Sequence, residues 1–497
     1  MRGPMLPAVV ALAAVVSLDA QLPGPFAERV EKRGLTVRIA EIARLPDTRG
    51  LRPPDQDTNP AGWARVSYVR DLPDGRRFVN DSRGVLYRLD GSTPERYLDF
   101  ASLFPHAVYN RLESGFISFA FHPEFAANGL FYTVHGERAA GNPTPPVFVP
   151  PGFTAADATY HNVITEWRAS DPAASQFAGT RRELYRGAHI VQNLTHPMGA
   201  AEFNPTARPG SPDYGLLYTS GSDHGFSNGG GPRANNPAQA QRLDSVITAI
   251  LRIDPRPPSA TGGVKGLGDY TVPAANRFAA DNDARTLGEI YAYGFRNAHR
   301  LAWDTDGTMF AFDIGMNHVE EVNVVVNGGN YGWMAREGVY ENGIVRPGGA
   351  LNQLFALPAD VLDGRGRDEF RYPVAMYDHR DGQAVSGGVA YHGRIAALAG
   401  KLVFGDVVRG RLFAADLAAL KAADDGVPRT VATIEEIQLY VRGADGRRVY
   451  TSFRELVEQT RGATMTRADL HLGVSRDGEI FVTSRQDGTI RMLMPEE

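Results

Sequence analysis

The sequence predicts an all-β fold, a six-bladed β-propeller in a single domain, from three observations. A glycine-containing turn is followed by a short apolar or aromatic strand at six places, whose glycines are Gly75, Gly129, Gly215, Gly307, Gly400 and Gly478. These glycines are separated by 54, 86, 92, 93 and 78 residues, which are irregular but similar intervals. Helical signals are few, so the repeated unit is a strand pair and the long segments between copies are loop insertions on one face.

Second strands follow three of the turns directly, in RGVLYRLDG from Arg83, RGRLFAADL from Arg409 and DGTIRMLM from Asp487. Each such pair predicts a hairpin, the repeating element of a propeller blade. A further strand is predicted near 36–43, before the first copy, and we place it in the last blade, where it closes the ring. Short helices are predicted at 417–423 and 452–460. Two β-sandwich domains are the competing interpretation, but no linker of biased composition divides the chain.

Residues 1–20 are typical of a secretory signal peptide. Arg2 is the charged start, residues 7–18 form a short apolar run, and Ala20 is a small residue at the expected cleavage point. The alternative is an N-terminal extension without a targeting role. The apolar run is too short to predict a membrane span, and no other segment predicts one. We therefore expect a periplasmic or secreted protein whose mature chain, 21–497, is one propeller domain.

The composition excludes several classes of function. A net charge of −5 lacks the basic field that nucleic-acid binding needs. The chain has no cysteine, which excludes disulfides, thiolate metal sites, a catalytic thiol and covalently attached haem. An apolar fraction of 43% is ample for a large core. Lysine is scarce, at positions 32, 265, 401 and 421 only.

The densest group of polar signals lies in residues 293–333. This segment combines a strand with a DG turn, an Arg-Asn pair, a Glu-Glu pair and the loop GGNYGW. A core needs none of these polar groups, and binding residues are commonly carried by loops on a rigid scaffold. We therefore expect this segment to contribute to a functional site.

Eight segments, in order along the chain, resemble the glucose/sorbosone dehydrogenase family. They are FISFAFHPEFAANGLFYTVH from Phe116, LTHPMGAAEFNP from Leu194, LYTSGSDHG from Leu217, ILRIDP from Ile250, YGFRNAHRLAWD from Tyr293, EEVNVVVNGGNYGW from Glu320, SGGVAYHG from Ser386 and LVFGDVVRGRLF from Leu402. The family comprises six-bladed propellers that include soluble quinoprotein sugar dehydrogenases. The resemblance implies an oxidoreductase that binds pyrroloquinoline quinone (PQQ) and Ca²⁺. The family's members oxidise an aldose at the anomeric carbon to a lactone, and we expect the substrate here to be a sugar or a related alcohol.

The resemblance also implies a catalytic group, residue by residue. His196 matches the general base, which takes the hydroxyl proton while hydride leaves for the quinone. Asp223 matches the acid that fixes the tautomer of that histidine and raises its basicity. Arg296 matches the arginine that offsets negative charge developing beside the quinone. Because covalent haem is excluded, electrons would pass to an external acceptor.

Cofactor and metal contacts follow from the same segments. Asn297 matches an amide that hydrogen-bonds the cofactor. The main-chain carbonyls of Gly315 and Met316 match the two that bind calcium, a cation that prefers oxygen ligands. Glu320 and Glu321 are compatible with a second calcium site or with pairing to arginines between blades, and we favour the structural role. The DTDG turn at 304–307 lacks the later ligands of a calcium loop, and we interpret it as a turn.

The chain departs from the family pattern where the cofactor's three carboxylates bind. Val408 stands where the family has a lysine, and Arg467 and Arg476 are too far apart to be the family's closely spaced arginine pair. Arg409 and Arg467 are the predicted substitutes, because arginine suits bidentate carboxylate contacts.

Two other functions are compatible with the same residues. A calcium-dependent hydrolase or lactonase would use His196, Asp223 and metal-bound water. A propeller without enzymatic activity would bind a glycan or a protein, since fold alone does not fix function. The substrate would be selected by the long insertions at 143–159, 225–241 and 339–368, which we expect to form the pocket walls.

Overall fold

The structure is a computed structural model that describes residues 30–57, 62–100, 102–109, 114–191, 194–226, 239–281, 283–351, 353–366, 369–444 and 446–496. The signal peptide expected at residues 1–20 lies outside the described residues. Within them the fold is mostly β, as the repeated turn-strand pattern predicted, with strands β1 to β28 and only short helices.

Four sheets contain four strands each and follow one another along the chain. The first contains β2 (Val66–Asp71), β3 (Arg77–Asp81), β4 (Val85–Asp90) and β5 (Thr93–Asp99). The second contains β6 (Phe116–Phe121), β7 (Leu130–Arg138), β8 (Tyr160–Ala169) and β9 (Gly179–His189). The third contains β10 (Ala201–Phe203), β11 (Leu217–Ser220), β12 (Ala249–Ile253) and β13 (Ile290–Tyr293). The fourth contains β14 (Ala298–Trp303), β15 (Met309–Asp313), β16 (Val319–Val325) and β20 (Ala375–Asp378).

A nine-stranded sheet holds the strands from the two ends of the chain. Its order is β21 (Val385–Tyr391), β22 (Lys401–Asp406), β23 (Leu412–Asp416), β24 (Glu435–Gly443), β1 (Glu31–Arg44), β28 (Thr489–Met494), β27 (Ile480–Ser484) and β26 (Leu470–Val474), and β25 (Gly446–Tyr450) pairs with β24. Strand β1 lies antiparallel to β28 and parallel to β24. The strand expected near 36–43 is therefore hydrogen-bonded to the last strand of the chain.

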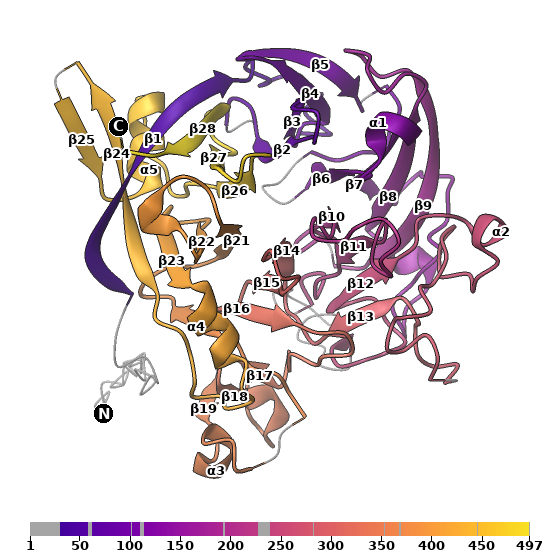
Figure 1. Ribbon diagram of the computed structural model, residues 1–497. Helices are drawn as coiled ribbons and strands as arrows, with labels where there is room; N and C mark the ends of the chain where they lie inside the picture. Colours follow the sequence, from indigo (N-terminus) through magenta and orange to yellow (C-terminus); the bar gives the residue numbers. More distant parts are fainter. Residues whose placement is uncertain are drawn as a thin grey trace, which may run out of the picture.

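The sheets follow one another around a ring (Figure 1). Apolar clusters lie between successive sheets: Phe78 and Phe131 belong to the cluster between the first two. Val66 of the first sheet shares a cluster with Phe481 of β27, so the end of the chain packs against its beginning. The core therefore lies between sheets rather than at the centre of the ring.

The six repeated glycines occupy equivalent places. Each has a positive φ and lies one or two residues before β3, β7, β11, β15, β22 or β27. A positive φ is a conformation that glycine adopts without steric cost. The turns that the sequence pattern predicted are therefore present at all six positions.

Helices are short and lie outside the main sheets. Both predicted helices are present, as α4 (Leu417–Ala423) and α5 (Phe453–Arg461). The Ser452 hydroxyl caps α5 by accepting from the Glu455 amide. The others are α1 (Phe125–Asn128), α2 (Pro258–Thr261), α3 (Ala359–Leu362) and the 3₁₀ turns η1 (Ala155–Asp157), η3 (Gly343–Val345) and η4 (Ala396–Leu398). Across the described ranges every helix is too short or too polar to span a bilayer.

A small sheet protrudes from the main ring. It contains β17 (Arg336–Glu337), β18 (Tyr340–Asn342) and β19 (Leu354–Ala356), and it lies mostly within the insertion expected at 339–368. Most of the insertion expected at 225–241 lies outside the described residues.

Candidate active site

His196 lies in the loop between β9 and β10, and hydrogen bonds fix both its imidazole ring and its backbone carbonyl. Its Nδ1 lies 2.7 Å from Oδ1 of Asp223. The Ser222 hydroxyl donates to the His196 carbonyl. The residue has a φ of +50° and is 4% exposed. A non-glycine residue in this region of φ is uncommon and directs attention to function.

Asp223, which follows β11, orients the imidazole. The same Oδ1 also accepts a hydrogen bond from the Gly225 amide at 2.8 Å, which fixes the carboxylate. A carboxylate can only accept, so the proton in the bond to His196 is carried by Nδ1 of the imidazole. This bond leaves Nε2 as the atom that can accept a proton when the ring is neutral, which is the tautomer a general base needs.

The Arg296-Asn297 pair lies in the loop between β13 and β14, and its backbone is fixed by a buried acid. The Asp313 carboxylate accepts from the amides of Arg296 at 3.0 Å and Asn297 at 2.6 Å. Burial raises the pKa of Asp313. The Asp223 amide donates to the Arg296 carbonyl at 2.8 Å, so the loop that carries the His-Asp pair is bonded directly to the loop that carries Arg296.

Gly315 and Met316 lie in the loop between β15 and β16, which is wrapped around a single carboxylate oxygen. Oε1 of Glu337 accepts from four successive amides, those of Met316 at 3.1 Å, Asn317 at 3.2 Å, His318 at 2.9 Å and Val319 at 3.1 Å. A Cβ on Gly315 would lie 1.7 Å from the Val319 carbonyl oxygen, so only glycine fits. Nη1 of Arg296 donates to the Gly315 carbonyl at 2.7 Å.

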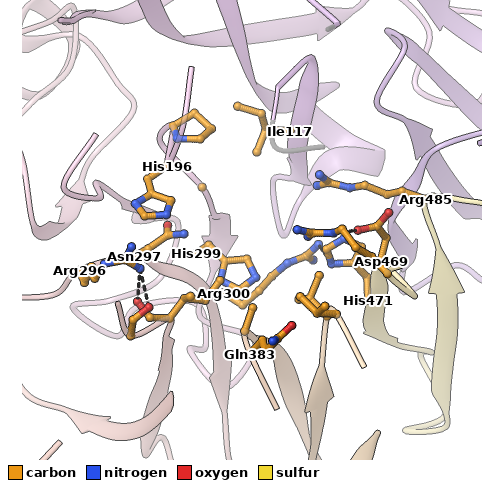
Figure 2. Close-up of a pocket in the computed structure, with 18 of the residues that line it drawn as sticks. Ile117, His196, Arg296, Asn297, His299, Arg300, Gln383, Asp469, His471 and Arg485 are labelled. Atoms are coloured by element: carbon orange, nitrogen blue, oxygen red, sulfur yellow. Dashed lines mark hydrogen bonds and ion pairs between the residues drawn. The ribbon is translucent and has the colours of Figure 1, made fainter. Parts of the chain in front are cut away.

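A cavity of about 220 Å³ brings most of these residues together (Figure 2). Of the predicted site residues, those that line it are His196, Arg296, Asn297, Gly315, Met316 and Arg467. Asp223 lies behind His196, to which it is bonded. Val408, at the position where the resemblance led us to expect a lysine, also lines the cavity.

Arg409, a predicted site residue, does not line the cavity. It is absent from the cavity lining, and its guanidinium donates to the carbonyls of His379 at 2.7 Å and Arg380 at 2.5 Å. Arg467 does line the cavity, and its Nε donates to Asp469 at 2.8 Å. Of the two predicted substitute cations, Arg467 alone reaches the site.

Several cavity residues are not among the site residues that the sequence predicted. They are Tyr68 of β2, His299 and Arg300 of β14, His471 of β26, and Arg485, which follows β27. Histidine and arginine within otherwise apolar strands, as in AHRLAW and LHLGV, are the signal that could have found them. Figure 2 shows Arg485 and His471 on the side of the cavity opposite His196.

The cavity is electropositive. Its lining includes four arginines, at 296, 300, 467 and 485, and a single carboxylate, that of Asp469. Burial, with the nearby charges of Arg300 and Arg485, lowers the pKa of His299 and of His471 well below the ordinary value. These two imidazoles are therefore neutral at physiological pH, and the positive field comes from the guanidinium groups.

Glu320 and Glu321 are occupied by contacts within the protein. Oε1 of Glu320 lies 2.8 Å from Nε2 of His379, and Oε2 accepts from the Val385 amide at 2.8 Å. Oε1 of Glu321 accepts from the Gly338 amide at 2.6 Å. Both acids therefore link neighbouring strands and loops, although none of these contacts involves the arginines that we expected.

A second, more open cavity of about 860 Å³ lies beside the insertion expected at 143–159. Pro143, Pro146, Tyr160 and His161 are among the residues that line it. The described residues of the three long insertions are absent from the lining of the first cavity, whose walls come from strands and short connecting loops. The expectation that the insertions form its walls is not met within the described part of the chain.

Comparison with known proteins establishes the family. The family model described as Glucose / Sorbosone dehydrogenase matches residues 66–448. The chain belongs to the glucose/sorbosone dehydrogenase family. The match begins at β2 and includes the loops that carry His196, Asp223 and Arg296.

Individual relatives of this glucose/sorbosone dehydrogenase family chain are distant. The HIPL1 protein of Arabidopsis thaliana is 28% identical over 380 residues, which cover 69% of this chain and 48% of that protein. The chain therefore spans about half the length of that curated relative.

Two solved structures share the fold. The apo soluble aldose sugar dehydrogenase of Escherichia coli has a TM-score of 0.55 at 16% identity, covering 93% of this chain and 100% of that one. The PQQ-bound aldose sugar dehydrogenase of Streptomyces coelicolor has a TM-score of 0.50 at 18% identity, covering 92% and 98%.

Proposed function

We propose that this protein is a quinoprotein-type oxidoreductase that oxidises an aldose or a related alcohol, with PQQ as the hydride acceptor. One observation supports the proposal most strongly: the His196-Asp223 pair faces a cavity lined by four arginines in a member of the glucose/sorbosone dehydrogenase family. We also propose that the sheets form six blades, that residues 1–20 are removed on export, and that the mature domain, 21–497, acts in the periplasm or outside the cell.

The donor set of the cavity fits an anionic quinone. PQQ carries three carboxylates, and the four lining arginines exceed the single acid by three positive charges. Two buried polar atoms of the lining, the Tyr68 hydroxyl and Nδ1 of His299, have no hydrogen-bond partner in the described part of the chain. Buried polar groups are normally satisfied, so these atoms are suited to contact a bound molecule.

The protein's own residues supply the acid-base chemistry. Nε2 of His196 takes the proton of the substrate hydroxyl, and Asp223 stabilises the imidazolium that forms. Arg296 lines the same cavity, where its positive charge would offset negative charge that develops during oxidation. When bound, PQQ supplies the hydride acceptor, and an external acceptor then removes the electrons.

Calcium would be held by main-chain oxygens. The Gly315 and Met316 carbonyls are the proposed ligands, and oxygen is the ligand atom that this cation prefers. The Glu337 carboxylate fixes the Met316 amide, and so determines where the loop presents these carbonyls. The Gly315 carbonyl also accepts a hydrogen bond from Nη1 of Arg296.

Reconstitution tests the proposal. Purified protein is incubated with PQQ and Ca²⁺, and dye reduction is followed with a panel of aldoses and alcohols. We expect activity that requires both additions, a rise in melting temperature on adding PQQ, and loss of activity in His196→Ala. No dye reduction together with an unchanged melting temperature would remove this function. Lactone hydrolysis abolished by a chelator would instead identify a calcium-dependent lactonase.

A further inference from the structure

Two buried arginines, Arg300 and Arg485, lie side by side in the cavity that Arg296 also lines. Arg300 of β14 is 6% exposed and Arg485 is 7% exposed. Nη2 of Arg300 and Nη2 of Arg485 donate to the same atom, Oγ of Ser67, at 3.3 Å and 2.7 Å. Two positively charged guanidinium groups therefore contact the same hydroxyl oxygen. Buried charges are costly unless they are paired, so a buried guanidinium such as that of Arg300 is stabilised by a compensating negative charge.

The protein does not supply that charge at Arg300. All three hydrogen bonds of this guanidinium use Nη2, with Ser67 O at 2.9 Å, Ser67 Oγ, and Nδ1 of His471 at 3.0 Å. Across the described residues, Nε and Nη1 have no protein acceptor, and no carboxylate lies within ion-pair distance. The Tyr68 ring, whose centroid is 3.4 Å from the guanidinium carbon, offsets part of the charge but accepts no N–H.

Two uncharged polar atoms beside the arginines have no hydrogen-bond partner among the residues that the structure describes. The Tyr68 hydroxyl and Nδ1 of His299 are both buried without a hydrogen bond. Both residues line the same cavity as Arg300 and Arg485. Figure 2 shows Arg300 and Arg485 reaching toward the middle of the cavity, with His299 and His471 beside Arg300.

We infer that Arg300, Arg485 and the Tyr68 hydroxyl form a carboxylate-binding subsite in the cavity. The planar forked guanidinium groups match a carboxylate in bidentate geometry. The site would replace the cation lost at Val408, because it provides positive charge from β14 and from the end of β27. This inference rests on the proposed function for its setting, although the subsite is defined by its own residues.

The carboxylate has two possible sources, the quinone cofactor and an acidic sugar substrate. Calorimetric titration distinguishes them, with PQQ, glucuronate and glucose as the three probes. The variants are Arg485→Gln, Arg300→Gln and Tyr68→Phe, and Arg252→Gln is the matched control. Arg252 is also 7% exposed, but it pairs with Asp213 and lies outside the cavity lining. Melting temperature and circular dichroism establish that each variant is folded.

Tyr68→Phe keeps the experiment informative if an arginine variant fails to fold. It removes a hydroxyl that has no protein partner, so we expect its melting temperature to match the wild type. We expect each arginine variant to weaken binding of the relevant probe by tenfold or more, Tyr68→Phe to weaken it severalfold, and Arg252→Gln to leave it unchanged. Higher salt should weaken wild-type binding and have less effect in the arginine variants.

The outcomes separate this inference from the proposed function. Weakened PQQ binding assigns the subsite to the cofactor, and weakened glucuronate binding with unchanged PQQ binding assigns it to an acidic substrate. Binding of glucuronate but not PQQ would remove the proposed function and retain the subsite. A different result would overturn the subsite and retain the proposed function. In that result the wild type catalyses PQQ-dependent dehydrogenation, and the folded variants bind PQQ and glucuronate as tightly as the wild type does.

Discussion

Replacing Asp223 by asparagine tests the catalytic pair at its most sensitive point. The change keeps the volume of the side chain and an oxygen for the Gly225 amide, but it removes the negative charge 2.7 Å from Nδ1 of His196. The imidazolium that forms when His196 accepts a proton then loses its counter-charge. The ground state, in which the imidazole is neutral, is affected far less.

The size of the effect follows from the charge separation. Two opposite charges about 4 Å apart interact by about 4 kcal/mol at an effective dielectric constant of about 20. Each 1.4 kcal/mol corresponds to about tenfold in rate, so Asp223→Asn should lower kcat about a thousandfold. This lies within the roughly 10²- to 10⁴-fold range of general-base catalysis.

The assay is dye reduction by protein reconstituted with PQQ and Ca²⁺, with KM and the PQQ affinity measured in parallel. Both should stay near the wild-type values, since Asp223 is separated from the cavity by His196. The double variant with His196→Ala should lose no more than His196→Ala alone, because the aspartate acts through the histidine. A kcat within tenfold of wild type in Asp223→Asn would refute the reasoning.

Three further predictions concern the cavity and its surroundings. Val408→Lys should tighten PQQ binding about tenfold by calorimetry, because it adds a cation to the cavity lining; weaker binding would contradict this. Gly315→Ala should lower stability by about 1–3 kcal/mol in denaturant unfolding, since its Cβ would lie 1.7 Å from the Val319 carbonyl oxygen; an unchanged midpoint would contradict the close contact. Burial and the Arg186 charge lower the pKa of His161 in the folded protein to about 4. The pKa of an unfolded histidine is about 6.5, so between about pH 6.5 and 4 the unfolded chain binds a proton at His161 that the native state does not bind. Stability should therefore fall as pH falls through that range, and His161→Asn should flatten the profile of melting temperature against pH.

The repeated turns made the fold predictable from the sequence. A glycine with positive φ before a short apolar strand is a local signal, and all six were correctly interpreted from residues such as Gly75 and Gly307. The helix at 417–423 was equally local, because the Asp416 side chain caps it by accepting from the Ala419 amide. Local chemistry determined these elements, so they needed no knowledge of neighbouring sheets.

The site was predictable where loops carry it and less so where strands do. His196 and Arg296 lie in loops whose segments resemble the family, and both line the cavity. Arg409 was expected beside Val408, but consecutive residues of a tight turn point in different directions, and only Val408 faces the cavity. Arg300 and Arg485 were not predicted. Arg300 lies on a strand and Arg485 in the turn after one, and whether such a residue lines a cavity depends on how whole sheets are placed.

Strand β1 has a consequence for the order in which the molecule can assemble. It is made early during synthesis, yet its partners β24 and β28 begin at Glu435 and Thr489. Its edges therefore remain open until almost the whole chain has been made, and closing so long a loop carries an entropic cost that local hairpins avoid. We expect the intermediate sheets to fold first and the ring to close last, in a slow step that depends on β1.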